Sequence, residues 1–372
     1  MVAFLDLAKI NGEVREQMAA AIDEVLSSGW YVLGKQVEQF EAEFAQFVGA
    51  KHCVGVGNGL DAICLALRAH GVGPGDEVIV PSNTFIATWL AVTYVGAVPV
   101  PVEPDPVTMN IDPARIEAAI TSRTRAICPV HLYGLPADLP EINALAQRHG
   151  LVVVEDAAQA HGASLDGAPV GSWGNTATWS FYPGKNLGAL GDGGAITTDD
   201  AEVAEKLRSL RNYGSSAKYV HELRGVNSRL DEMQAAVLRV KLSKLSEWNT
   251  RRGQIAQRYL EGLEGTGLTL PSVTDGVHSA WHLFVIRTER REELRGELDA
   301  RGIQTLIHYP TSPHMQGAYA DDFSPGEFPI AEHMQDRVLS LPMGPHLSLE
   351  DADDVVAAIR ELTSRMEAEP PR

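Results

Sequence analysis

The sequence predicts an α/β fold in which a large domain with a mostly parallel sheet precedes a smaller α/β domain. The chain has 372 residues, which is too long for one small core. Between about residues 50 and 200, short β-rich runs alternate with amphipathic stretches, as in a parallel sheet with helices on both faces. After about residue 228 a long amphipathic stretch begins. We therefore place the large domain, with the N-terminal segment, at residues 1–245 and the small C-terminal domain at residues 246–372.

The elements of the large domain are predicted from apolar runs and from helix start signals. Apolar residues between Leu60 and Leu67 recur at helical spacing. Asp112 and Pro113 have the form of a helix N-cap followed by proline at the first helical position. Strands are expected at residues 53–56, 76–80, 97–102, 124–130, 151–154, 177–181 and 194–198.

The small domain is expected to begin on a long amphipathic helix. Its apolar residues, from Met233 to Leu245, lie on one face. Helices are predicted at residues 230–248, 291–301 and 349–366, and strands at residues 281–287 and 303–308.

Composition and charge exclude several classes of protein. The net charge of −18 opposes binding to a polyanion, so we expect no nucleic-acid partner. No apolar run reaches the length of about 18 residues that a membrane helix needs, and we expect no signal peptide. The three cysteines are widely spaced and are expected to be reduced, buried thiols of a cytoplasmic protein, with no metal site.

A glycine-rich turn follows the first predicted strand. Ligands of open parallel sheets bind outside the carboxyl ends of the strands, so polar residues that follow strands are the candidates for a site. Gly57-Asn58-Gly59-Leu60-Asp61-Ala62 opens a helix and matches G-x-G-x-x-A. Its backbone could hold an anion, it could bind a dinucleotide, or it could be a tight turn without a ligand. The dinucleotide interpretation is weakened because no ribose-binding acid ends the next strand, but the motif alone leaves all three interpretations open.

Two further strands deliver an acid and a lysine. Asp156 follows an apolar strand and could keep the pyridine nitrogen of pyridoxal 5'-phosphate protonated, while Gln159 could reach the ring oxygen. Lys185 follows the next strand in a glycine-flanked turn, where partial burial would lower its pKa toward the nucleophilic form. Ser180 could bind a phosphate. A phosphate turn, an acid and a Schiff-base lysine in this order fit pyridoxal phosphate better than a nicotinamide cofactor.

A basic segment between the two domains could bind a phosphate or diphosphate. Arg224 and Arg229 flank Asn227, and Lys218-Tyr219 precedes them. The opposite interpretation is a solvated charged loop. The strongly negative net charge favours the first, because any phosphate-bearing ligand needs a local cluster of donors.

These segments together resemble the DegT/DnrJ/EryC1/StrS family of sugar aminotransferases. The resemblance runs from Phe4 to Pro342. Its motifs are Gly75-Asp76-Glu77-Val78-Ile79-Val80-Pro81, Glu155-Asp156-Ala157-Ala158-Gln159-Ala160, Gly184-Lys185-Asn186 and Asn227-Ser228-Arg229-Leu230-Asp231. It implies the aspartate-aminotransferase-like fold of type I, with a mostly parallel seven-stranded sheet in the large domain.

The resemblance also implies roles for individual residues. Lys185 would form the Schiff base with pyridoxal 5'-phosphate and shuttle the proton, and Asp156 would pair with the ring nitrogen. The other implied cofactor contacts are Gly59, Leu60, Phe85, Gln159, Ser180 and Asn227, the last reaching the neighbouring subunit of a homodimer. The implied substrate contacts are Tyr182, Lys218, Tyr219, Arg224, Arg229, His308 and Tyr309.

Within the family, the segments 181–192 and 307–310 look like the branch that acts on dTDP-3-keto-deoxyhexoses. Lysine rather than histidine at position 185 favours transamination over dehydration. The resemblance thus implies transfer of an amino group from an amino acid, L-glutamate, to a nucleotide-linked keto sugar for antibiotic or polysaccharide biosynthesis. The alternatives are a 4-keto-sugar aminotransferase, an NAD-dependent dehydrogenase built on the glycine turn, and a non-catalytic regulator.

Overall fold

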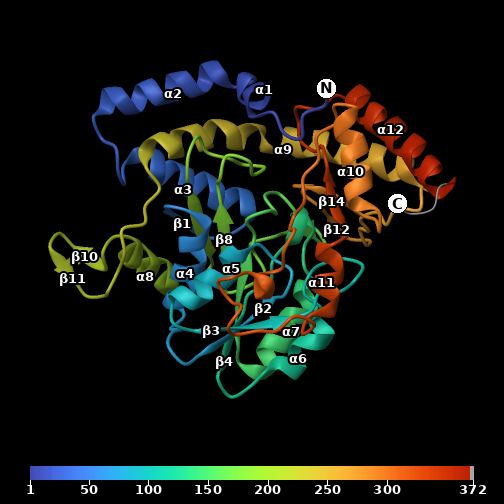
Figure 1. Ribbon diagram of the computed structural model, residues 1–372. Coiled ribbons are helices and arrows are strands. Elements are labelled where there is room, and N and C mark those ends of the chain that lie inside the picture. Colours follow the sequence, from blue (N-terminus) through green and yellow to red (C-terminus); the bar gives the residue numbers. More distant parts are fainter. Residues whose placement is uncertain (369–372) are drawn as a thin grey trace.

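The computed structural model describes residues 1–368 and has the α/β architecture that the sequence predicts (Figure 1). Its centre is a seven-stranded sheet of order β1-β9-β8-β5-β4-β2-β3. Within this sheet only β9 runs antiparallel to its neighbours, so the prediction of a mostly parallel sheet is confirmed. The strands are β1 (His52–Val56), β2 (Glu77–Pro81), β3 (Val98–Val102), β4 (Thr124–Ile127), β5 (Val152–Asp156), β8 (Thr176–Ser180) and β9 (Gly194–Thr198).

All seven predicted strands form, and two of them end more than one residue away from the predicted end. The run predicted at residues 124–130 stops at Ile127, and Val130 keeps only an isolated bridge to Asp156. Strand β5 continues two residues further than predicted and ends on Asp156 itself. The carboxylate of this residue therefore lies at the carboxyl edge of the sheet, where ligands of parallel sheets bind.

Helices cover both faces of the sheet. One face packs against α4 (Gly59–Ala69), α5 (Ile86–Tyr94) and α8 (Ala201–Arg211). The other face packs against α6 (Pro113–Ala119), α7 (Leu139–His149), α3 (Lys35–Val48) and α9 (Glu232–Leu263). The strand interiors are therefore buried on both sides, which explains why the predicted strands are continuous apolar runs rather than alternating ones.

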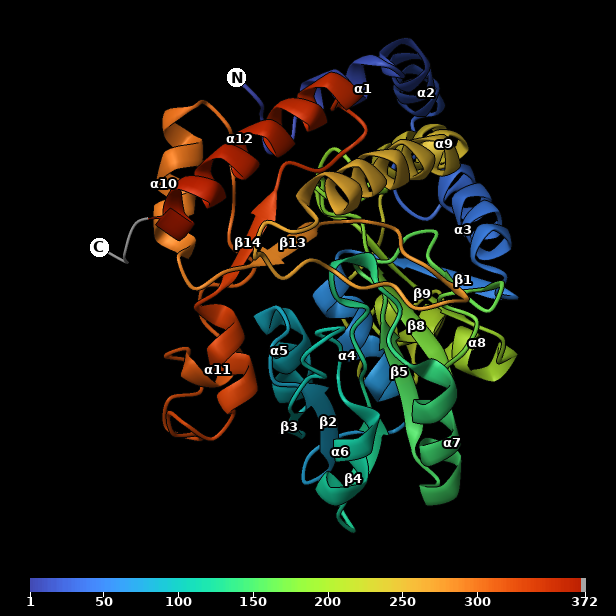
Figure 2. The same ribbon diagram turned by 90° about the vertical axis from the view of Figure 1, so that its right-hand side faces the viewer.

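Helix α9 is longer than the predicted helix at residues 230–248. It has 32 residues and runs from the large sheet to the small domain (Figure 2). Beyond Trp248 the buried positions Ile255, Ala256, Tyr259 and Leu263 continue at helical spacing and enter the small-domain core. The helix extends beyond the predicted end because its second half packs in the small-domain core, as its first half packs in the large-domain core. Helices α1 (Leu7–Gly12) and α2 (Arg15–Ser28) precede α3 in the chain, and α2 packs on α9.

The small domain contains only one of the two predicted strands. The predicted strand at residues 281–287 is confirmed from Phe284 onward, as β13 (Phe284–Arg287), and pairs with β14 (Val338–Leu341). The strand predicted at residues 303–308 is wrong, because Ile303 bridges Val2 whereas Leu306 bridges Ser340. Two different partners split this run, so no continuous ladder forms. The helices are α10 (Arg291–Ala300), α11 (Pro329–Gln335) and α12 (Leu349–Ala368).

The remaining elements are short. They are β6 (Ser164–Leu165), β7 (Ala168–Pro169), β10 (Ser215–Ala217), β11 (Val220–His221), β12 (Val277–His278) and the 3₁₀ turns η1 (Leu132–Gly134) and η2 (Pro313–Met315). The β10–β11 hairpin projects from the body of the molecule (Figure 1). Within residues 1–368, no helix has both the length and the apolarity needed to cross a bilayer. The three cysteines are free, and two of them are buried.

Candidate active site

The glycine turn after β1 lies directly against the end of β8. A Cβ atom added to Gly59 would come within 2.7 Å of the Cβ of Ser180, so this approach requires glycine. The Asn58 side chain accepts the N–H of Asp61 at 2.8 Å and caps α4. The N–H groups of Gly59 and Leu60, in the first helical turn, remain available to an anion beside the Ser180 hydroxyl. These three predicted phosphate contacts therefore form one cradle.

Lys185 lies in a turn just beyond β8. Its backbone N–H donates to the carbonyl of Tyr182 at 2.8 Å, which closes the turn. Burial lowers the pKa of the Lys185 amine to about 8, and the negative charge of Asp156 opposes this shift. Lys185 is half-buried, and with this pKa about a tenth of its amine is neutral at pH 7, far more than for an ordinary lysine. The neutral amine is the form that attacks a carbonyl.

Asp156 is buried, and its carboxylate is held from two sides. The Thr88 hydroxyl donates to one carboxylate oxygen at 2.8 Å, and the N–H of Ala158 donates to the other at 3.2 Å. Burial raises the pKa of Asp156, while the Thr88 hydrogen bond and the charge of Lys185 counteract that shift. A buried carboxylate without a full cationic partner is suited to hold a protonated ring nitrogen.

The neighbouring acid Glu155 has a structural role. Its carboxylate accepts the N–H groups of Gly171 at 3.0 Å and Gly174 at 2.6 Å, and it contacts His131 at 3.1 Å. The Nδ1 atom of His131 accepts the N–H of Ala137, so the Nε2 atom is the donor to Glu155. Since strand side chains alternate, Glu155 supports a loop on the opposite side from Asp156.

Gln159, Tyr309 and Phe85 form one wall of the site. The amide oxygen of Gln159 accepts the N–H of Tyr133 at 2.6 Å, and its amide nitrogen donates to the Tyr309 hydroxyl at 3.0 Å. The Phe85 and Tyr309 rings lie 5.3 Å apart between centroids. Phe85 is 52% exposed, so its ring face is free to contact a planar ligand.

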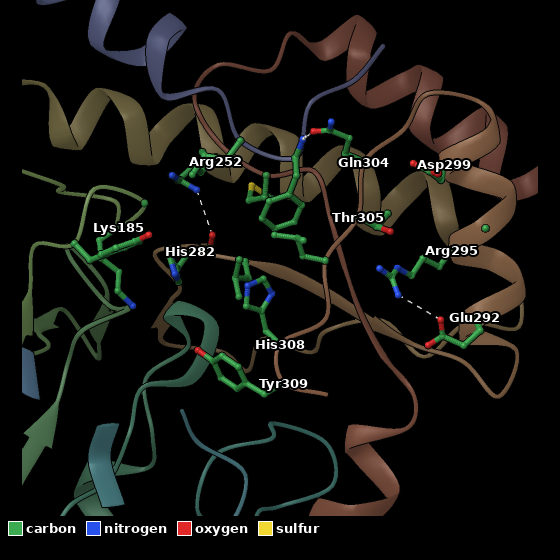
Figure 3. Close-up of a pocket in the computed structure, with 18 residues that line it drawn as sticks. Lys185, Arg252, His282, Glu292, Arg295, Asp299, Gln304, Thr305, His308 and Tyr309 are labelled. Carbon is green, nitrogen blue, oxygen red and sulfur yellow. Dashed lines mark hydrogen bonds and ion pairs between the residues drawn. The ribbon is translucent and has the colours of Figure 1, made fainter. Parts of the chain in front are cut away.

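A cavity of about 920 Å³ opens beside Lys185 (Figure 3). Of the predicted substrate contacts, Tyr182, His308 and Tyr309 line it. Its walls come from both domains and from the N-terminal residues Phe4 and Leu5. The space beside Lys185 thus continues along the small domain as far as α10, which contributes Arg295 and Asp299.

Three residues of the site were missed by the sequence reasoning. Thr88 bonds to Asp156, and His282 and Arg252 line the cavity with Lys185. No motif marks them, because each lies within a helix or loop that is distant in sequence from the lysine and the acid.

The structure does not bring the basic segment to this cavity. Lys218 and Tyr219 lie at the turn of the projecting β10–β11 hairpin, and Arg224 follows it on the surface (Figure 1). Asn227 is exposed, and Arg229 donates to the Asn212 side chain at 3.1 Å. Lys218, Tyr219, Arg224 and Asn227 are exposed and Arg229 is half-buried, and none of the five lines the cavity.

The donor set fits pyridoxal phosphate. The cradle at Gly59 and Ser180 suits a phosphate, the buried carboxylate of Asp156 suits a pyridinium nitrogen, and the amine of Lys185 suits a carbonyl. The groups come from the ends of three strands, β1, β5 and β8, and β8 supplies both Ser180 and Lys185. Phe85, Gln159 and Tyr309 contact one another, and the exposed Phe85 ring could cover a flat ligand.

Comparisons with known proteins agree with this chemistry. The sequence model of the DegT/DnrJ/EryC1/StrS aminotransferase family matches residues 13–360. The chain is 59% identical over 361 residues to "Erythromycin biosynthesis sensory transduction protein EryC1" of Saccharopolyspora erythraea, covering 96% of this chain and 99% of the relative. It is 56% identical over 368 residues to "dTDP-3-amino-3,4,6-trideoxy-alpha-D-glucose transaminase" of Streptomyces venezuelae, covering 98% and 97%.

Two solved structures are also similar. One is S. venezuelae DesV in complex with a ketimine intermediate, with a TM-score of 0.97, 56% identity, and coverage of 98% of this chain and 99% of that chain. The other is NtdA from Bacillus subtilis with bound cofactor PMP, with a TM-score of 0.92, 36% identity, and coverage of 98% and 85%. The similarity therefore extends over nearly the whole chain, both domains included.

Proposed function

This chain belongs to the DegT/DnrJ/EryC1/StrS aminotransferase family, and from that premise we propose the reaction it catalyses. It uses pyridoxal 5'-phosphate to transfer an amino group from L-glutamate to a dTDP-linked 3-keto-deoxyhexose. The product is a 3-amino sugar for antibiotic or polysaccharide biosynthesis. The enzyme works as a homodimer in the cytoplasm, where free thiols such as its three cysteines stay reduced.

The observation that carries this proposal is the convergence of Lys185 and Asp156. Two strand ends bring a buried carboxylate and an amine of lowered pKa into electrostatic contact at one edge of the sheet. An amine that must bond a carbonyl needs this lowered pKa, and a ring that must absorb charge needs a fixed carboxylate. A non-catalytic regulator would need neither the Lys185 amine nor the Asp156 carboxylate, so their presence argues against that alternative.

The chain's own residues divide the work. Bound pyridoxal phosphate supplies an electron sink, and the protein positions it and moves protons. Asp156 keeps the ring nitrogen positively charged, and Thr88 fixes the orientation of Asp156. Gln159 contacts the ring oxygen, Phe85 covers a ring face, and Gly59, Leu60 and Ser180 hold the phosphate. Lys185, once its amine is free, carries the proton from the Cα atom of the donor.

The name of one similar protein supports the sugar assignment. The S. venezuelae relative is named for an amino group on carbon 3 of a dTDP sugar. His308, Tyr309 and Tyr182, which line the cavity, then contact the sugar. The predicted contacts Lys218, Tyr219, Arg224 and Arg229 act on the site of a second subunit, as does the phosphate contact Asn227.

The 4-keto sugar remains the alternative acceptor, and no residue in the cavity distinguishes a 4-keto from a 3-keto sugar. A dinucleotide is not proposed, because Asp156 and Lys185 have no role in hydride transfer.

The test compares acceptors directly. Purified protein is expected to show a visible absorption band that L-glutamate bleaches. The bleached enzyme is then offered dTDP-3-keto and dTDP-4-keto deoxyhexoses, and NMR of the product locates the amine. Amination of the 3-keto sugar at a much higher kcat/KM supports the proposal. A preference for the 4-keto sugar, or no amination of either, contradicts it.

A further inference from the structure

Arg252 is a buried arginine without an acidic partner. It lies on α9 and is 3% exposed. Its guanidinium donates only to the carbonyl oxygens of Trp281 at 3.2 Å and His282 at 3.4 Å, and its Nε atom has no partner. No carboxylate within residues 1–368 forms an ion pair with it. The other buried arginine, Arg211, is ion-paired with Glu41.

The side of the cavity that Arg252 shares with Lys185 carries positive charge, whereas the acidic lining residues Glu292 and Asp299 lie on α10 at the other side (Figure 3). Burial is the main cause that lowers the pKa values of His161 and His282, and the positive charges of Lys185 and Arg252 add to this shift. Burial also lowers the pKa of Arg252, which shows how little solvent compensates its charge. An unpaired buried cation is costly, and an anion that enters the cavity would offset that cost.

The position of Arg252 identifies the anion. Figure 3 shows its guanidinium beside His282 and on the same side of the cavity as Lys185. The amino group of a donor must reach the place that the Lys185 amine occupies, and its α-carboxylate is then only one carbon atom away from that amino group. The cofactor phosphate has its own cradle at Gly59 and Ser180, neither of which lines this cavity. The nearest anion is therefore the donor carboxylate.

We propose that Arg252 binds the α-carboxylate of the amino-acid donor, an inference that rests on the proposed transaminase function. The guanidinium is already oriented by the two carbonyl groups of residues 281 and 282, and its remaining N–H groups are free to form a charge-assisted pair. The competing interpretation is structural: Arg252 would serve only to hold the turn at Trp281 and His282 against α9.

The experiment measures donor binding in the holoenzyme without any nucleotide sugar. The probe is 2-methylglutamate, which has no α-proton to lose, so its binding is read at equilibrium from the shift of the visible band. Arg252→Gln is expected to raise its Kd about 10- to 100-fold, the range for a lost charge-assisted hydrogen bond. Arg252→Lys keeps the charge and should raise it less. Arg251→Gln, the next residue on α9 and paired with Glu13 on the surface, is the matched control and should change nothing.

Two further measurements separate the outcomes. The dissociation constant for the dTDP sugar, measured with the pyridoxamine form, should be unchanged in Arg252→Gln and Arg252→Lys. An unchanged Kd for 2-methylglutamate, or an equal loss of affinity for 2-methylglutamate and the dTDP sugar, would overturn the role of Arg252. Either result would leave the transaminase function intact. Wild-type enzyme that binds no amino acid would instead contradict the proposed function. If Arg252→Gln does not fold, the test rests on Arg252→Lys alone. A Kd for 2-methylglutamate equal to that of the wild type would then contradict the inference.

Discussion

At the scale of single residues, two adjacent acids on β5 have opposite tasks. The Glu155 carboxylate accepts hydrogen bonds from N–H groups of the loop at residues 171–174 and from His131. Asp156 points to the site and accepts from Thr88. The alternation of side chains along a strand makes this division, and it means that substitutions at the two positions should have different consequences.

Replacing Asp156 with alanine is expected to lower kcat on the order of 10²–10³-fold, the size typical of losing one preorganised charged group at a reacting centre. Cofactor binding should weaken much less, because the phosphate cradle is unaffected. Steady-state kinetics and the bound fraction of cofactor check this. Thr88→Ser keeps the hydroxyl that orients Asp156 and serves as the control. Turnover that survives Asp156→Ala would show that another acid sustains the ring charge.

The lowered pKa of Lys185 makes cofactor loading depend on pH. Only the neutral amine bonds the cofactor carbonyl, and with a pKa of about 8 the neutral fraction grows as pH rises toward 8. The loading rate of cofactor-free protein should thus increase about tenfold per pH unit below that value and level off above it. Stopped-flow absorbance between pH 6.5 and 10 measures this. A rate that keeps rising to pH 10 would mean that the amine behaves like an exposed lysine.

At the scale of elements, the start of α9 also caps α3. The N-cap residue of α3, Gly34, has no side chain to accept the first N–H groups of the helix. The buried carboxylate of Glu232, in the first turn of α9, accepts the N–H groups of Gly34 at 2.8 Å, Gln36 at 2.8 Å and Val37 at 3.0 Å. One residue therefore joins two helices that are almost 200 positions apart.

Glu232→Ala should destabilise the fold by about 3 kcal/mol, since it leaves buried N–H groups without an acceptor. Thermal unfolding of the holoenzyme measures the effect as a lower Tm. Glu247→Ala, on the same helix but on its exposed side, removes a carboxylate paired with Lys244 and Arg251 and should leave Tm unchanged. Equal shifts for the two variants would contradict the capping role.

At the scale of the whole molecule, the basic segment does not line the cavity of its own chain. The β10–β11 hairpin extends away from the cavity, with Tyr219 84% exposed at its turn (Figure 1). Phe85 and Tyr182, which lie at the candidate site, are also exposed. In the proposed homodimer, we expect the exposed aromatic side chains of the hairpin and of the site to cover each other.

Co-expression of two inactive variants tests this pairing. Lys185→Ala removes the lysine of its own site, and Asn227→Asp places a negative charge where a phosphate of the neighbouring site is expected. If sites are shared between subunits, heterodimers contain one intact site, and a random mixture should recover about a quarter of wild-type sites. Activity in differently tagged, purified heterodimers measures this. No activity beyond the sum of the two homodimers would show that each site belongs to a single chain.

The sequence by itself determined the order of elements and the chemistry of the large domain. Apolar runs bounded by turn residues marked all seven strands, since burial on both faces requires continuous apolar strands. The acid, the lysine and the glycine turn were recognisable because each directly follows a strand. The domain boundary at residues 245 and 246 stays a prediction, and α9 runs through it without a break.

Only the tertiary structure decided what depends on contacts between distant segments. The run at residues 303–308 looked like a strand, but its neighbours Val2 and Ser340 come from opposite ends of the chain and divide it. Thr88, His282 and Arg252 carry no local signal, because their importance arises from what surrounds them after folding. A sequence pattern records periodicity and turns, whereas burial and charge balance at a site depend on long-range packing. For this reason the buried, unpaired charge of Arg252 became visible only in three dimensions.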